Sequence, residues 1–272
     1  MENLTYLECL RKLSNMLSDL ENNSNQAKWL LCHILDIDFN QMLLSMDKIT
    51  KEQSDKIIES ANRLLEGYPL QYLIGSTEFM GLEFKVAENV LIPRNDTEVL
   101  VDHVIKHIGD KAVNVIDMCC GSGCIGLSIK HYCKNANVTL CDISDYALNL
   151  TKENAKLLNL DVNIIKTDLF TNVNDKFDVL VSNPPYIESC EIDKLSKQVQ
   201  CEPRLALDGK EDGLFFYRRI ANECGKVLND DATIFLEIGH NQGKSVSDLF
   251  ETATVYKDLQ GRDRVIIARR WN

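Results

Sequence analysis

Residues 113–126, VNVIDMCCGSGCIG, form an apolar run that passes directly into a glycine-rich segment. The apolar part, 113–120, predicts a buried strand, and the next apolar run, 125–129, suits a helix. Small residues between a strand and a helix let the backbone approach a ligand closely, and the helix start offers free N–H groups. The turn therefore predicts a ligand site at Cys119, Cys120, Gly121, Ser122 and Gly123.

The glycine spacing alone leaves the ligand open. Gly121, Gly123 and Gly126, with Asp142 about twenty residues on, also match a dinucleotide-binding fingerprint. Asp117 argues against a dinucleotide, because it lies inside the strand, four residues before the first glycine. There it can hold a positively charged ligand or brace the loop. We expect the amino-acid part of a cofactor, and not a pyrophosphate, to lie over the glycines.

Two further predicted strands end in carboxylates. The strand 138–141 ends at Asp142, whose carboxylate can bind a ribose diol, and the strand 162–165 leads to Asp168 and Phe170. Asp168 can accept from an adenine amine, while Phe170 offers a ring for the face of the base. Amino acid, ribose and adenine follow one another along the strand ends, which predicts S-adenosylmethionine as the cofactor.

A stiff loop follows the strand 179–182, with the sequence Asn183-Pro184-Pro185-Tyr186. Two prolines fix φ near −65° and remove two backbone N–H donors. The Asn183 side-chain oxygen and the Pro184 carbonyl can each accept one hydrogen of a flat –NH2 group, and Tyr186 can stack on its plane. We assign Asn183, Pro184 and Tyr186 to catalysis, all four residues to substrate binding, and Asn183 to the cofactor site as well.

Three more stretches complete a resemblance to a known family. They are PLQYLIG at 69–75 with FMGL at 79–82, LIPRNDTE at 91–98, and EPRLALDG at 202–209 with the segment 212–220. Together with the motifs above, they resemble the peptide chain release factor N(5)-glutamine methyltransferase family, within the class I S-adenosylmethionine-dependent methyltransferases. The resemblance covers about residues 65–270. It departs from the family at Cys119-Cys120, where Gly-Thr is usual, and at Asn95, where a proline is usual.

Composition limits the classes of partner. The chain has 41 acidic and 30 basic residues, a net charge of −11, which disfavours direct binding to nucleic acid. Ten cysteines without a C-x-x-C pair predict a reduced, cytoplasmic protein. No leader or apolar run long enough for a membrane span is expected. His103 and His107 have a metal-ligand spacing but no evident third ligand, so no metal is expected, and we expect a monomer.

The chain divides into three predicted parts. Residues 1–75 carry leucines at helical spacing and predict three amphipathic helices, around 4–20, 27–35 and 57–65, with N-caps at Ser24-Asn25 and Thr50. We expect this helical domain to recognise the substrate, and 76–92 to form a β-hairpin linker. Residues 93–272 alternate strand and helix, which predicts an α/β fold with a parallel sheet. The strands 254–259 and 264–268 predict an antiparallel C-terminal hairpin, as in the class I methyltransferase fold.

The resemblance implies transfer of a methyl group from S-adenosylmethionine to the side-chain amide of a glutamine. That glutamine would lie in the Gly-Gly-Gln loop of a peptide chain release factor. Three alternatives remain open at this point: a glutamine of a ribosomal protein, an amino group of nucleic acid such as adenine N6, and a cofactor-binding scaffold without activity. Glu237, at the end of a predicted strand, is either a functional acid or a structural brace.

Overall fold

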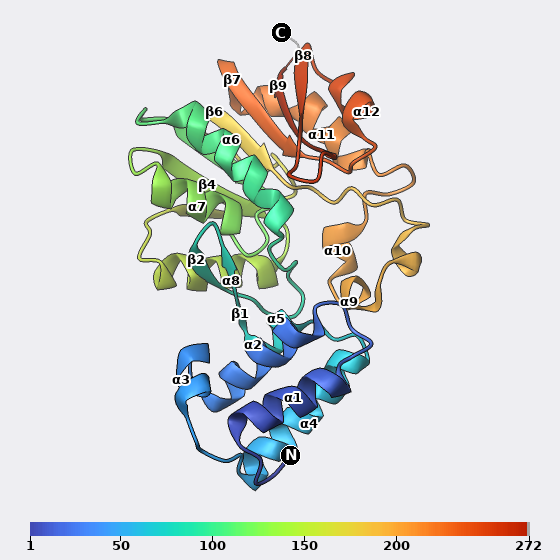
Figure 1. Ribbon diagram of the computed structural model, residues 1–272. Helices are drawn as coiled ribbons and strands as arrows, with labels where there is room; N and C mark the ends of the chain where they lie inside the picture. Colours follow the sequence, from blue (N-terminus) through green and yellow to red (C-terminus); the bar gives the residue numbers. More distant parts are fainter. Residues whose placement is uncertain (271–272) are drawn as a thin grey trace. The chain divides into compact units, whose positions relative to one another are not determined.

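The computed structural model describes residues 1–270 (Figure 1). The chain forms two compact units. Residues 1–75 and 196–201 form the first, and residues 76–195 with those from 202 onward form the second. The hairpin segment thus groups with the second unit, and the short segment 196–201 groups with the first although it is remote in sequence.

The first unit is helical. Its helices are α1 (Tyr6–Met16), α2 (Asn23–Leu35), α3 (Phe39–Leu44), α4 (Lys51–Leu65), α5 (Leu70–Ile74) and α9 (Lys197–Gln200). The three predicted amphipathic helices correspond to α1, α2 and α4, whose apolar residues meet in one core. The other three span four to six residues, too few for periodicity to reveal them.

One of the two predicted helix caps is confirmed. The Thr50 hydroxyl accepts from the backbone N–H of Gln53 at 3.2 Å, and the Gln53 side chain accepts from the Thr50 N–H at 2.9 Å. The cap at Ser24-Asn25 is wrong, because α2 already begins at Asn23. Asn22 adopts a left-handed conformation there, with φ of 53°, so that the backbone turns into the helix without a side-chain cap.

The second unit starts with an antiparallel hairpin, β1 (Ser76–Phe79) and β2 (Leu82–Lys85), followed by an α/β domain. The strands of its sheet are β3 (Asn114–Met118), β4 (Asn137–Asp142), β5 (Asn163–Lys166), β6 (Phe177–Ser182), β7 (Leu228–Glu237), β8 (Thr252–Lys257) and β9 (Asp263–Arg269). The α-helices are α6 (Glu98–Ile108), α7 (Cys124–Tyr132), α8 (Asp145–Leu157), α10 (Arg204–Leu207), α11 (Phe215–Glu223) and α12 (Gly243–Ser247). Short 3-10 helices are η1 (Asn95–Thr97), η2 (Ile192–Lys194) and η3 (Cys224–Lys226).

The seven-stranded sheet has the order β5-β4-β3-β6-β7-β9-β8. Strands β3 to β7 pair with one another in parallel, while β9 is antiparallel to both β7 and β8. The predicted antiparallel C-terminal hairpin is therefore confirmed. The last strand, β9, inserts between β7 and β8, a placement that hairpin geometry alone does not specify.

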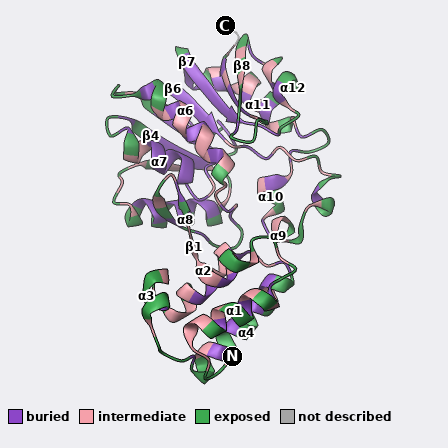
Figure 2. Cartoon of the chain, viewed as in Figure 1, coloured by how far each residue is buried: buried purple, intermediate pink, exposed green. Residues whose placement is uncertain are grey.

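Apolar residues cover both faces of this sheet, because helices pack on both. One face places Val115, Val179, Val181 and Phe235 against residues of α6, α7 and α8. The other places Ile116, Leu180, Ile234 and Leu236 against residues of α11 and α12. Figure 2 shows the strands β6 and β7 coloured as buried along most of their length. None of the helices within residues 1–270 is both long and apolar enough to cross a membrane.

Strand order reverses beside β3: the chain moves outward to β4 and β5, and then returns to β6 on the other side. In open parallel sheets, ligands bind in the crevice that such a reversal leaves at the carboxyl ends of the strands. These ends are Met118, Asp142, Lys166, Ser182 and Glu237, for β3 to β7 in turn.

Leu180, in the central strand β6, tests how far stability depends on this core. The side chain is fully buried, so Leu180→Ala should lower the free energy of unfolding by ~2–5 kcal/mol through lost burial and a residual cavity. Leu259→Ala is the matched control, since Leu259 is fully exposed and its loss should change stability by at most ~0.5 kcal/mol. Urea unfolding followed by far-UV circular dichroism measures both. Equal urea midpoints for the two variants would contradict the assignment of Leu180 to the core.

Candidate functional site

A cavity of about 350 Å³ opens at the carboxyl ends of the parallel strands. Its size falls at the lower end of the ~300–1,000 Å³ typical of small-molecule sites. Eight of the predicted site residues line it: Cys119, Cys120, Gly121, Ser122, Asp142, Asp168, Asn183 and Pro185. Apolar side chains that the sequence did not single out complete the wall: Val90, Ile92, Ile143, Leu169, Phe215 and Phe216.

Four predicted site residues lie behind this wall. Gly123 starts α7 with φ of 80°, and a Cβ there would come within 2.9 Å of Thr151. Phe170 is buried in the core on the α11 face, while its neighbour Leu169 reaches the cavity. Pro184 is buried, and Tyr186 is half-buried with its hydroxyl turned toward Glu237.

Asp117 braces the glycine turn. Its side chain is fully buried, and its Oδ2 accepts from the backbone N–H of Gly126 at 2.8 Å. Burial, with a smaller contribution from the nearby Asp142, raises the pKa of Asp117 to about 8, although the Gly126 N–H opposes this. A carboxyl group that is largely protonated at neutral pH, and that does not line the cavity, is poorly suited to a cationic ligand. Of the two roles left open by the sequence, the structure supports the brace.

The two cysteines of the turn serve as small, uncharged residues. Burial raises the pKa of both thiols, so that neither forms a thiolate readily. Cys119 has φ of 62°, a left-handed conformation that glycine adopts without the penalty imposed by a Cβ. The departure from the family pattern at Cys119 therefore places a side chain at a strained position of the glycine-rich turn.

Asp142 joins the turn to the second strand. Its Oδ2 accepts from the N–H of Gly121 and its Oδ1 from the N–H of Ser144, both at 2.9 Å. Burial raises its pKa, although hydrogen bonds from the backbone of Ser144, Gly121 and Ile143 oppose this. A carboxylate offers about four acceptor sites, so that acceptor capacity remains for a ribose hydroxyl. The residues present thus fit the sugar of the predicted cofactor.

Asp168 carries a partner that the sequence did not reveal. Its Oδ1 forms an ion pair with Arg219 at 2.7 Å, and Arg219 also pairs with Glu223 at 2.9 Å. Both Asp168 and Arg219 line the cavity. In the sequence, only the four-residue spacing of Arg219 and Glu223 on α11 indicated an ion pair of Arg219.

The Asn183–Tyr186 loop is held from several sides. The Ser182 hydroxyl donates to the Met118 carbonyl at 2.6 Å, which ties β6 to β3 just before the loop. The Asn183 Nδ2 donates to the Thr97 hydroxyl at 3.4 Å, and Gln242 donates to the Tyr186 carbonyl at 3.0 Å. Thr97 lines the cavity and received no role from the sequence.

Two glycines of the third family-like stretch lie against this loop. A Cβ at Gly209 would come within 2.8 Å of the Tyr186 backbone, and one at Gly213 within 2.4 Å of the Tyr186 carbonyl oxygen. Gly209 also donates to the Ile187 carbonyl at 2.8 Å. The segment 207–213 therefore packs so closely that a larger residue at either position would displace Tyr186.

Glu202 holds two cavity-lining segments together. It is buried, accepts from the backbone N–H of Ile92 at 3.0 Å, and forms an ion pair with Arg94. Arg204, two residues on, pairs instead with Asp193 at 3.2 Å. Glu202 therefore forms a structural ion pair beside the cavity. Within residues 1–270, no group of three or more His, Cys, Asp or Glu side chains is placed to hold a metal ion.

The Asp142 carboxylate can be tested by binding alone. We expect Asp142→Ala to weaken binding of S-adenosylmethionine by ~2–3 kcal/mol, because charge-assisted hydrogen bonds to the ribose are lost. Asp145→Ala, three residues on and exposed, removes the same charge and should leave affinity unchanged. Calorimetry on folded variants gives the answer. Equal affinity for the two variants would remove Asp142 from the site.

Comparison with known proteins agrees with this geometry. Residues 8–75 match the family model described as PrmC N-terminal domain, and residues 94–207 match Methyltransferase small domain. A release factor glutamine methyltransferase of Clostridium botulinum is 41% identical over 258 residues, covering 90% of this chain and 91% of that one. A protein of the same name from Bacillus cereus is 38% identical, covering 96% and 98%.

Solved structures show the same fold at low identity. A methyltransferase from Pyrococcus furiosus is 16% identical with a TM-score of 0.54, covering 78% of this chain and 99% of that chain. The 16S rRNA N2 G1207 methyltransferase of T. thermophilus, solved with AdoMet and guanosine, is 14% identical with a TM-score of 0.53, covering 72% and 50%. These likenesses confirm the class I methyltransferase fold. Identity and coverage over nearly the whole length show that the chain belongs to the release factor glutamine methyltransferase family.

Proposed function

We propose that this protein transfers a methyl group from S-adenosylmethionine to the side-chain amide nitrogen of a glutamine in a peptide chain release factor. The glutamine is that of the Gly-Gly-Gln loop. The observation that carries the proposal is the placement of Asn183 on the wall of the cavity that Asp142 also lines. The names of the relatives supply the substrate class.

Positioning supplies most of the catalysis in this proposal. Bound S-adenosylmethionine supplies a methyl group on a positively charged sulfur. Asn183 and the Pro184 carbonyl accept the two hydrogens of the glutamine –NH2, while Tyr186 packs on the amide plane. The amide nitrogen is a weak nucleophile because its lone pair is delocalised, so fixing its angle of approach matters. The nitrogen becomes far more acidic once methylated, and its proton can leave then without a dedicated base.

The remaining assignments are part of the same proposal. Residues 1–75 recognise the protein substrate, 76–92 link the parts, and 93–272 carry out transfer, with Gly123 and Phe170 supporting the cavity from behind. The net charge of −11 favours a protein over nucleic acid as substrate. We further propose a monomer in the cytoplasm, where the ten free thiols stay reduced.

Labelled S-adenosylmethionine incubated separately with release factor, ribosomal proteins, tRNA and DNA tests the substrate class. We expect label in release factor and none after the glutamine of its Gly-Gly-Gln loop is changed to alanine. Label in one of the other three substrates alone would overturn the proposal.

Asn183 is the residue on which turnover should depend most. Asn183→Ala removes one of two acceptors for the glutamine –NH2, which should slow single-turnover transfer ~100- to 1000-fold, or ~2.7–4 kcal/mol. Asn183→Asp keeps an acceptor, but its charge near the sulfonium stabilises the reactant over the transition state. Cofactor affinity should change less than the rate in both variants.

The control for this variant is Asn135→Ala, at an exposed asparagine away from the cavity. It should retain the wild-type rate. A rate for Asn183→Ala within a few-fold of wild type, at saturating cofactor and substrate, would show that the loop does not orient the acceptor.

The helical unit exposes apolar side chains at the end of α3. Leu44 and Met46 are each 85% exposed, which costs free energy in water unless a partner covers them. We expect the double change Leu44→Ser and Met46→Ser to lower kcat/KM for intact release factor while cofactor affinity stays unchanged. Leu259→Ser, at a fully exposed leucine of the second unit, is the control. Unaltered kcat/KM in the double variant would exclude these side chains from recognition.

A further inference from the structure

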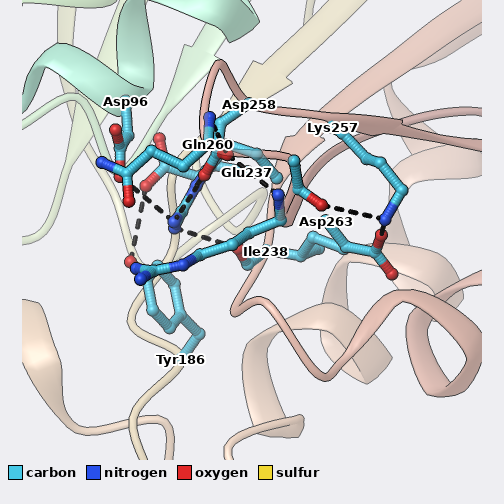
Figure 3. A network of polar contacts seen from close by, with 11 residues as sticks. Asp96, Tyr186, Glu237, Ile238, Lys257, Asp258, Gln260 and Asp263 are labelled. Atoms are coloured by element: carbon cyan, nitrogen blue, oxygen red, sulfur yellow. Dashed lines mark hydrogen bonds and ion pairs between the residues drawn. The ribbon is translucent and has the colours of Figure 1, made fainter.

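Glu237 is a buried acid that the mechanism above does not use. It ends β7 and is 2% exposed, on the side of the sheet that faces the start of α6. Its Oε1 accepts from the Tyr186 hydroxyl at 3.5 Å, as Figure 3 shows. Its Oε2 is buried without a hydrogen-bond partner among the described residues, and the Thr97 hydroxyl lies near enough to the carboxylate to lower its pKa as a donor does. The two ends of the Asn183–Tyr186 loop therefore meet one carboxylate, Tyr186 directly and Asn183 through Thr97.

Thr97 lies where η1 runs into α6, with helical backbone angles of φ −69° and ψ −21°. A residue with helical angles is not placed to cap the following helix, so its hydroxyl has no local partner in the helix backbone. Thr97 is buried, and its hydroxyl accepts from the Asn183 Nδ2 at 3.4 Å. The threonine side chain is therefore free to contact Asn183.

The direction of the hydrogen bonds follows from the chemistry of the three groups. An ionised carboxylate only accepts, so the single proton of the Thr97 hydroxyl goes to Glu237. The Thr97 oxygen is then left to accept, and the end of the Asn183 amide that faces it must be the –NH2. With its nitrogen held by Thr97, the Asn183 amide directs its oxygen away from Thr97, where it can accept from the substrate. An amide that was flipped would present –NH2 to the –NH2 of the substrate.

We propose that Thr97 and Glu237 are positioning residues that fix the orientation of the Asn183 amide, so that its oxygen accepts from the substrate nitrogen. This inference rests on the proposed methyl transfer to an amide. It adds two residues that act through Asn183, and it makes transfer depend on the charge of Glu237.

Several ionisable groups face Glu237 from the elements packed around it: Asp96 of η1, Cys124 of α7, Tyr186 of the loop, Tyr217 of α11 and Arg264 of β9. Arg264 favours the ionised carboxylate, and it is itself held by Asp258 at 3.2 Å and Asp96 at 3.1 Å. Burial is the largest influence and raises the pKa of Glu237 to about 7.

The sign of the pH dependence follows. Below its pKa, Glu237 carries a proton and can donate to Thr97, whose own proton can then turn toward Asn183 and favour the flipped amide. Transfer should therefore be fast above the pKa and slow as pH falls through about 7. The pKa values of Cys124, Tyr186 and Tyr217 are all raised from their ordinary ranges, so these groups stay neutral over this interval.

The experiment compares wild type with Thr97→Val, Thr97→Ser and Glu237→Gln, by single-turnover transfer to release factor between pH 6 and 8. Thr97→Val keeps the shape but lacks the hydroxyl and should slow transfer ~10- to 100-fold, the cost of a misplaced reacting group. Thr97→Ser restores the hydroxyl and should recover most of the rate. Glu237→Gln should be slow and lose the fall in rate near pH 7.

A spectroscopic measurement separates positioning from general damage. With 15N-labelled asparagine, the side-chain –NH2 signal of Asn183, identified by its absence in Asn183→Ala, should shift with a midpoint near pH 7 in wild type. It should not titrate in Glu237→Gln. Cofactor affinity by calorimetry and the midpoint of thermal unfolding should stay close to wild type in Thr97→Ser and Thr97→Val.

Two results would overturn the inference while leaving the proposed function intact. One is a transfer rate of Thr97→Val within two-fold of the wild-type rate. The other is a fall in rate near pH 7 that is as steep in Glu237→Gln as in wild type. If Thr97→Val does not fold, the Glu237→Gln profile and the Asn183 signal decide. Absence of any transfer by wild type would instead overturn the proposed function.

Discussion

The parallel pairing of β3 with β4 on one side and β6 on the other is the constraint on which the site depends. It brings the ends of strands that are far apart in sequence to one edge of the sheet. The glycine turn after β3, Asp142 at the end of β4 and Asn183 after β6 line one cavity for this reason. The apolar residues on both faces of the sheet keep this edge in place.

Close backbone packing then sets the shape of the loops on that edge. A Cβ at Gly126 would come within 2.9 Å of Asp117, and one at Gly209 within 2.8 Å of the Tyr186 backbone. At both positions a larger residue would push a site element out of place. The glycines of this chain therefore serve the packing of helix and loop against strand at least as much as the approach of a ligand.

Four largely enclosed carboxyl groups have different roles around the site, and each role follows from the partners of the group. Asp117 bonds a helix start, Asp142 bonds two backbone N–H groups of the cofactor loops, and Glu202 pairs with Arg94. Glu237 contacts Tyr186 and Thr97. Burial raises the pKa of all four, and the hydrogen-bond donors around each carboxyl group oppose this rise.

The sequence by itself determined the fold class, the long amphipathic helices, the antiparallel C-terminal hairpin and eight residues of the cavity wall. These follow from local periodicity and from motifs that stand directly at strand ends. Only the tertiary structure decided that Thr97 and Arg219 reach the cavity, that Phe170 turns into the core, and that β9 enters the sheet beside β7. Contacts such as Asn183 with Thr97 join residues 86 positions apart, and no local pattern encodes a contact that depends on how strands and helices pack.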